Sequence, residues 1–110
     1  MNVSMYVAAV NRTMNGGLTT RDAQLNYALG LTGEAGEVAE LIKKHVFHKH
    51  PLEKEKLIKE LGDVAWYLVA LAETNGIPLA DIFAANISKL KARYPDGFKT
   101  QDSYNRSAEA

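Results

Sequence analysis

Apolar residues recur at spacings of three and four along most of the chain, which is the pattern of helices with one buried face. Alternating apolar and polar runs bounded by turn residues, the pattern of strands, are missing. The hydrophobic pattern therefore predicts an all-α fold. The expected helices cover residues 3–13, 21–47, 52–74 and 78–93.

Residues typical of helix ends separate these segments. Gly16 and Gly17 break the first pattern, and Thr19 or Thr20 is expected to cap the second helix, with Asp22 completing a weak capping box. A bend is expected where glycines stand at positions 30, 33 and 36. The later boundaries are expected before Pro51, at Asn75 and Gly76, and at Pro78, which should begin the fourth helix.

The end of the chain differs from the rest. The stretch YPDGF, residues 94–98, predicts a turn. The following KTQDSYNRSAEA is polar and without periodicity, which indicates a mobile tail or an arm that orders only against a partner. We therefore expect a single domain over residues 1–98 and a polar tail over residues 99–110.

Composition narrows the class of protein. Thirteen basic residues balance thirteen acidic ones, so no bulk charge favours a nucleic-acid polymer or an anionic membrane as partner. The chain has no cysteine, which excludes disulfides and thiol catalysis and fits a cytoplasmic location. No stretch approaches the roughly 18 apolar residues that a membrane span needs.

An internal repeat places acidic residues in matching positions on two helices. LTGEAGEVAELI, residues 31–42, aligns with LIKELGDVAWYL, residues 57–68. The alignment pairs Glu34 with Glu60 and Glu37 with Asp63. A helical wheel puts these acids beside the apolar stripe of each helix rather than opposite it. A short connection around Pro51 makes the two helices an antiparallel hairpin, in which the four acids converge.

Four converging carboxylates need a cation. They would otherwise repel one another and take up protons, whereas oxygen ligands from two E-x-x-[ED] turns suit Mg²⁺, with Mn²⁺ as a substitute. Gly36 and Gly62 are expected to let the two backbones approach. The alternative is a solvated acidic face, which a single E-x-x-E would normally form. A ferritin-like di-iron site is disfavoured because Glu-x-x-His pairs are missing.

Basic and aromatic residues supply candidate contacts for an anionic ligand. On the fourth helix, Asn86, Lys89 and Arg93 share one face, and beside a bound divalent ion such a strip can hold a polyphosphate. Lys43 and Lys44 extend this possibility. Each basic residue alone is equally compatible with a surface charge, and Trp66 and Tyr94 with simple packing.

Three stretches together carry a family resemblance. GEAGEVAELIKK, KELGDVAWYL and NISKLKARYPDGF resemble the MazG-like all-α nucleoside triphosphate pyrophosphohydrolases over about residues 25–98. The 22 residues between Glu37 and Glu60 are an ordinary spacer for that family. The resemblance implies Mg²⁺ bound by Glu34, Glu37, Glu60 and Asp63, and cleavage of a nucleoside triphosphate to its monophosphate and pyrophosphate. It also implies Lys44 as a phosphate contact and Asn86, Lys89, Arg93 and Tyr94 as nucleotide contacts.

These observations give one expected function and two alternatives. The expected reaction is a metal-assisted attack of water on the α-phosphorus, with Glu34 or Glu37 as general base. The alternatives are a non-catalytic dimerisation module and a regulator that holds a nucleotide without cleaving it. The third helix is apolar nearly all round, so we expect a homodimer or homotetramer in which hairpins assemble into a helix bundle. Three histidines, His45, His48 and His50, are expected to be partly exposed without a role in turnover.

Overall fold

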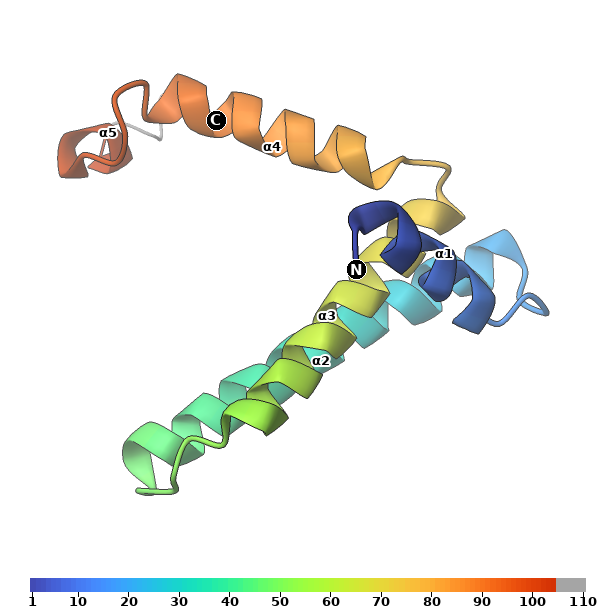
Figure 1. The fold of residues 1–110 in the computed structure, drawn as a ribbon, viewed down its shortest axis with the longest axis horizontal. Helices are drawn as coiled ribbons and strands as arrows, with labels where there is room; N and C mark the ends of the chain where they lie inside the picture. Colours follow the sequence, from blue (N-terminus) through green and yellow to red (C-terminus); the bar gives the residue numbers. More distant parts are fainter. Residues whose placement is uncertain (105–110) are drawn as a thin grey trace. The chain divides into compact units, whose positions relative to one another are not determined.

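The computed structural model describes residues 1–104 and consists of helices and turns (Figure 1). The helices are α1 (Val3–Thr13), α2 (Thr20–Phe47), α3 (Lys54–Thr74), α4 (Leu79–Arg93) and α5 (Thr100–Tyr104). No strand occurs among the described residues. The predicted all-α class is confirmed, and the four predicted helices agree with α1 to α4 to within two residues at each end.

Local capping explains why the helices end where they do. The backbone N–H of Asp22 donates to Thr19 Oγ1 at 3.1 Å, so Thr19 caps α2 as one of the two predicted candidates. Asn75 ends α3, and Gly76 follows with φ at +66°, a conformation that favours glycine. Pro78 caps α4. These boundaries are set by neighbours in the sequence.

The tail contains more structure than the polar sequence predicts. Thr100–Tyr104 forms α5, with the Ser103 N–H donating to the Lys99 carbonyl at 3.2 Å. The polar tail, predicted to be mobile or to order only against a partner, therefore includes a short helix at these residues. Five residues are too few for hydrophobic periodicity to reveal a helix. The rest of the predicted tail, residues 105–110, lies outside the described residues.

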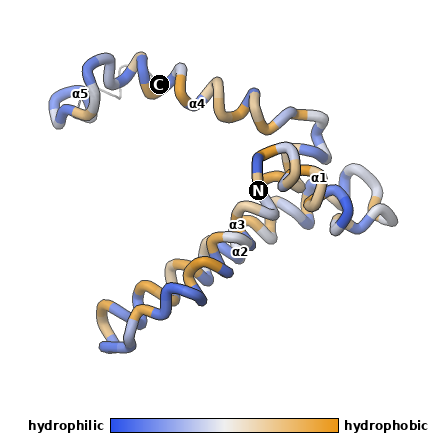
Figure 2. Tube along the Cα trace, in the orientation of Figure 1, coloured by the Kyte–Doolittle hydropathy of each residue, from blue (hydrophilic) through white to orange (hydrophobic). Residues whose placement is uncertain are grey.

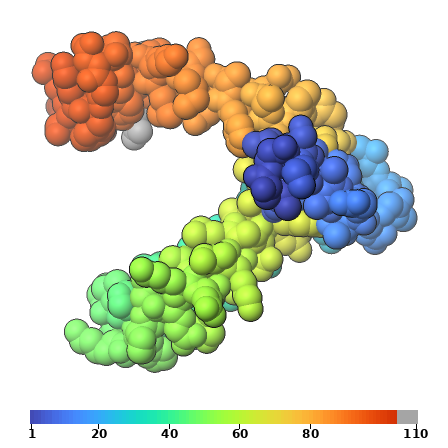
Figure 3. Space-filling model, in the orientation of Figure 1, coloured from blue at the N-terminus to red at the C-terminus, as the bar shows by residue number. Residues whose placement is uncertain are grey.

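The chain falls into two compact units, residues 1–76 and a second unit that begins at Ile77. In the first unit, α2 and α3 lie side by side as an antiparallel hairpin, and α1 packs against α3 (Figures 1 and 3). The hairpin predicted from the repeat is present. In the second unit, α4 is followed by the predicted turn, in which the Gly97 N–H donates to the Tyr94 carbonyl at 3.1 Å.

The core of the first unit is small and lies where α1 packs. Its buried side chains are Val10, Ala23, Tyr27, Val69, Ala70 and Ala72. Polar contacts join the same elements: Asn11 Nδ2 donates to Glu73 Oε1 at 2.8 Å, and Gln24 Nε2 donates to Asn75 Oδ1 at 2.6 Å. The core and these hydrogen bonds therefore stabilise the end of the hairpin where α2 begins and α3 ends.

The close approach between α2 and α3 occurs at Gly30. The ring of Tyr67 packs directly on its backbone, where a Cβ atom would overlap the ring. The predicted close approaches at Gly36 and Gly62 are wrong, because a Cβ atom at either would meet no described atom within 4 Å. Both glycines are exposed, so they lie off the surface that the two helices share.

Among the described residues no single helix is long and apolar enough to cross a membrane, although α3 and α4 taken together reach the length and hydropathy of a broken span.

Candidate metal centre

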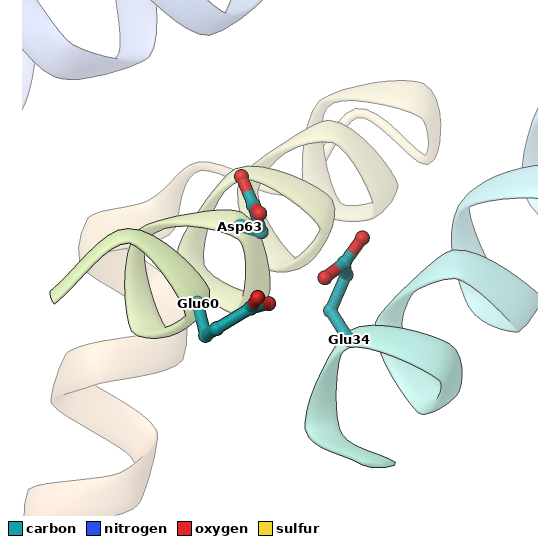
Figure 4. Close-up of side chains that lie close together, drawn as sticks. All are labelled: Glu34, Glu60 and Asp63. Atoms are coloured by element: carbon teal, nitrogen blue, oxygen red, sulfur yellow. The ribbon is translucent and has the colours of Figure 1, made fainter. Parts of the chain in front are cut away.

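Three carboxylates meet across the hairpin. Glu34 comes from α2, and Glu60 and Asp63 come from successive turns of α3, with one oxygen of each within 4.8 Å of the others. Figure 4 shows Glu34 on one helix facing the two α3 acids on the other. Glu34 and Glu60 are half-buried and Asp63 is exposed. The antiparallel pairing of the two repeat halves brings them together, as the sequence predicted.

The electrostatics of the group show the repulsion between its members. The pKa of Glu34 lies above the ordinary glutamate value, because of desolvation first and then the charges of Asp63 and Glu60, a hydrogen-bonding contact with Glu60, and the charge of Glu37. Desolvation and the charge of Asp63 also raise the pKa of Tyr6. A divalent cation would relieve this repulsion, and the donors are the hard oxygens that Mg²⁺ and Mn²⁺ prefer. The residues therefore fit a metal ion.

Glu37 lies outside this close group. It is exposed on α2, one turn beyond Glu34, and its charge is among the causes that raise the pKa of Glu34. The structure thus brings together three of the four predicted metal ligands and leaves the fourth nearby on the same helix.

The predicted phosphate contact Lys44 forms an ion pair with Glu40 on its own helix. Its Nζ atom is 3.9 Å from Glu40, which also pairs with Lys43 at 3.4 Å. All three side chains are about half exposed, so these ion pairs add little stability. Glu40 is therefore a surface acid.

The predicted nucleotide contacts lie on the second unit. Asn86, Lys89 and Arg93 belong to α4 and share one helical face, as expected from their spacing. Tyr94 caps the helix and packs against Phe98 with ring centroids 5.4 Å apart.

The three histidines, which we call the loop histidines, lie where α2 ends. The Nδ1–H of His45 donates to the carbonyl oxygen of His50 at 2.8 Å, and the rings of His48 and His50 are 6.3 Å apart. All three are exposed, as predicted. The bond from His45 closes the loop before Pro51, which gives this imidazole a structural function.

A pocket of about 370 Å³ opens beside the carboxylates. It is lined by Thr13, Glu34, Asp63, Trp66 and Tyr67. The sequence did not identify Thr13 or Tyr67 as candidates, because no local spacing shows that α1 packs onto α3 or that a glycine accommodates a tyrosine.

The Tyr6 hydroxyl, also from α1, donates to the Gly62 carbonyl between the two α3 acids at 3.4 Å.

Comparison with known proteins identifies the family of the chain. The family model of the MazG nucleotide pyrophosphohydrolase domain matches residues 22–98, which include all the predicted site residues. The chain therefore belongs to the MazG nucleotide pyrophosphohydrolase family.

Two relatives are similar in sequence. The chain is 33% identical to the gene 37 protein of Mycobacterium phage L5 over 114 residues, covering 96% of this chain and 100% of that protein. It is 34% identical to the Bacillus subtilis (strain 168) protein YvdC over 73 residues, covering 58% of this chain and 69% of YvdC. No solved structure matches the chain significantly.

Proposed function

We propose that this protein is a Mg²⁺-dependent nucleoside triphosphate pyrophosphohydrolase that cleaves ribo- or deoxyribonucleoside triphosphates to the monophosphate and pyrophosphate. The observation that carries the proposal is the group formed by Glu34, Glu60 and Asp63, with an oxygen of each within 4.8 Å, inside the segment that matches the family. Mn²⁺ should replace Mg²⁺, since both prefer oxygen ligands.

The acidic residues would bind the metal ion and activate the water. Glu34, Glu60 and Asp63 would hold the ion. Glu37, one turn beyond Glu34 on α2, would serve as the fourth ligand. Bound Mg²⁺ would polarise the phosphate oxygens and neutralise charge as pyrophosphate leaves. Either Glu34 or Glu37 takes a proton from the water that attacks the α-phosphorus.

Basic and amide side chains hold the rest of the substrate. Lys44, Asn86, Lys89 and Arg93 contact the phosphates and sugar, and Tyr94 lies against the nucleotide. Lys44 would leave its weak surface pair with Glu40, which costs little because both side chains are about half exposed.

The first test is incubation with a panel of ribo- and deoxyribonucleoside triphosphates in Mg²⁺, in Mn²⁺ and in EDTA, with products identified by phosphorus NMR. Monophosphate and pyrophosphate should form with either metal and disappear in EDTA. If no triphosphate is cleaved, the enzyme proposal fails, and titration calorimetry with Mg²⁺ and nucleotide then separates a regulator from a dimerisation module.

Replacing one carboxylate tests the site itself. Glu60→Gln should lower turnover by roughly a hundredfold or more while helical circular dichroism stays unchanged. Glu55→Gln is the matched control, because Glu55 is an exposed acid on the same helix outside the group. An active Glu60→Gln variant, or an equal loss in the control, would contradict this metal centre.

We also propose that the chain forms a homodimer or homotetramer. Large apolar side chains are exposed along the hairpin, including Leu25 at 57%, Leu29 at 63%, Phe47 at 74% and Ile58 at 68%. Figure 2 shows hydrophobic positions along the full length of α2 and α3. Apolar surface of this extent marks an interaction site, and a second copy of the same hairpin is a matching partner.

Light scattering at micromolar concentration should give a dimer or tetramer mass. The double variant Leu25→Glu/Leu29→Glu, which charges one turn of α2, should lower that mass with unchanged helicity. A stable wild-type monomer would contradict the proposed assembly.

A further inference from the structure

The pocket beside the acids is lined by two chemically different kinds of side chain. Glu34 and Asp63 supply carboxylates, and Trp66 and Tyr67 supply aromatic rings. Its volume of about 370 Å³ falls within the range of small-molecule sites, about 300–1,000 Å³. The carboxylates suit an ion that carries phosphates, and the aromatic rings suit a flat apolar group.

The indole of Trp66 is fixed by contacts from three elements. Its Nε1–H donates to Thr13 Oγ1 of α1 at 2.8 Å. Tyr27 of α2 packs edge-on against it with centroids 5.6 Å apart, and Tyr67 of α3 does so at 5.0 Å. Because Tyr27 is 3% exposed, this support is anchored in the core.

Thr13 is itself held in place. Its hydroxyl lies 3.0 Å from the carbonyl oxygens of both Ala9 and Val10, to which it donates within α1. Its oxygen is thereby oriented to accept from the indole. Since the indole N–H is already engaged by protein, Trp66 offers the pocket ring surface and no donor. Ring surface with fixed orientation is suited to stacking.

We propose that this pocket binds the nucleobase of the substrate, stacked on Trp66, and that Thr13 positions the indole for it. The proposal rests on the proposed function, since it names where the base of that nucleotide lies. It assigns α1, which precedes the residues that match the family model, a part in substrate binding. Stacking on an aromatic side chain accepts every base, so affinity should vary modestly from base to base.

Trp66 is the only tryptophan of the chain, so its fluorescence reports on this pocket alone. The probes are an α,β-methylene nucleoside triphosphate, which resists cleavage, and inorganic tripolyphosphate, which has the phosphates without the base, both with Mg²⁺. The nucleotide analogue should quench the fluorescence. Tripolyphosphate should bind in calorimetry and leave the fluorescence unchanged. Equal quenching by both probes, or no binding of the analogue, overturns the proposal.

Variants separate stacking from folding. Trp66→Leu should weaken analogue binding by roughly 10- to 100-fold in calorimetry and leave tripolyphosphate binding unchanged. Thr13→Val removes the acceptor at an exposed position and should raise KM more than it lowers kcat, with Thr13→Ser restoring the wild-type value. Thr74→Val is the matched control, because Thr74 makes the same bond to a helix carbonyl, at 2.8 Å, without an indole partner.

The outcomes also distinguish this proposal from the proposed function. Cleavage by the wild type with equal effects of Trp66→Leu on both probes overturns the base pocket and keeps the enzyme. Selective binding of the analogue without cleavage of any triphosphate keeps the base pocket and overturns the enzyme.

Discussion

Gly30→Ala should destabilise the protein, although alanine is the better helix former. A Cβ atom at this position would lie 2.5 Å from Cδ1 and Cζ of Tyr67 and closer still to Cε1. The ring is confined by Trp66, 5.0 Å away edge-on, and by Tyr27, 6.3 Å away. Overpacking of this kind costs about 1–3 kcal/mol, and the gain in helix propensity offsets about 1 kcal/mol. The net loss should be up to about 2 kcal/mol.

Urea denaturation followed by circular dichroism measures this loss at fixed protomer concentration, with light scattering to confirm an unchanged mass. Gly33→Ala is the matched control on the same helix, because a Cβ atom there meets no described atom within 4 Å. It should stabilise by about 0.5–1 kcal/mol. In a Tyr67→Leu background the penalty of Gly30→Ala should shrink, since the ring is its cause. If Gly30→Ala is as stable as Gly33→Ala, the packing of Tyr67 on α2 is refuted.

Three further predictions concern charge, the loop and α1. The pKa of Glu34 is higher in the folded state than in the unfolded state. Its protonation therefore stabilises the fold below the unfolded pKa, and this stability is lost as pH rises through the folded pKa. In EDTA, the wild type should therefore lose stability relative to Glu34→Gln as pH rises from the unfolded glutamate pKa of about 4.3 through the higher folded pKa. Urea denaturation at a series of pH values measures this difference, and parallel curves would refute the repulsion. Replacing the loop histidines by asparagine should leave Mg²⁺-dependent turnover nearly intact in the phosphorus NMR assay; a collapse would show a catalytic role. Asn11→Ala should cost about 1 kcal/mol by removing the bond to Glu73, and an unchanged denaturation midpoint would show that this contact does not hold α1.

The sequence predicted the parts of this fold that depend on neighbouring residues. Helix ends follow caps such as Thr19 and Asn75, whose partners lie within four positions. The acidic group was predictable because the repeat fixes the phase of each helix and a short loop fixes their antiparallel pairing. Two local signals together thus placed Glu34 opposite Glu60.

Contacts between distant segments could not be predicted from spacing. Gly30, Gly33 and Gly36 look alike in the sequence of α2, yet only Gly30 contacts the ring of Tyr67. The register in which α2 and α3 pack decides which glycine lies against the ring. The same holds for Thr13, whose indole partner is 53 positions away. The contact between Thr13 and Trp66 depends on how α1 packs against α3, which residue spacing does not predict.

The uneven distribution of the core has a consequence for motion. The buried side chains of the described residues belong to α1, the first turns of α2 and the last turns of α3. The other end of the hairpin, around the loop histidines, has none. Backbone amides there should exchange with solvent by local fraying, while those near Val69 exchange only on wider unfolding. The carboxylates lie between the loop end of the hairpin and the core. An ion bound by both helices would therefore link them at this point and limit local unfolding to the loop end.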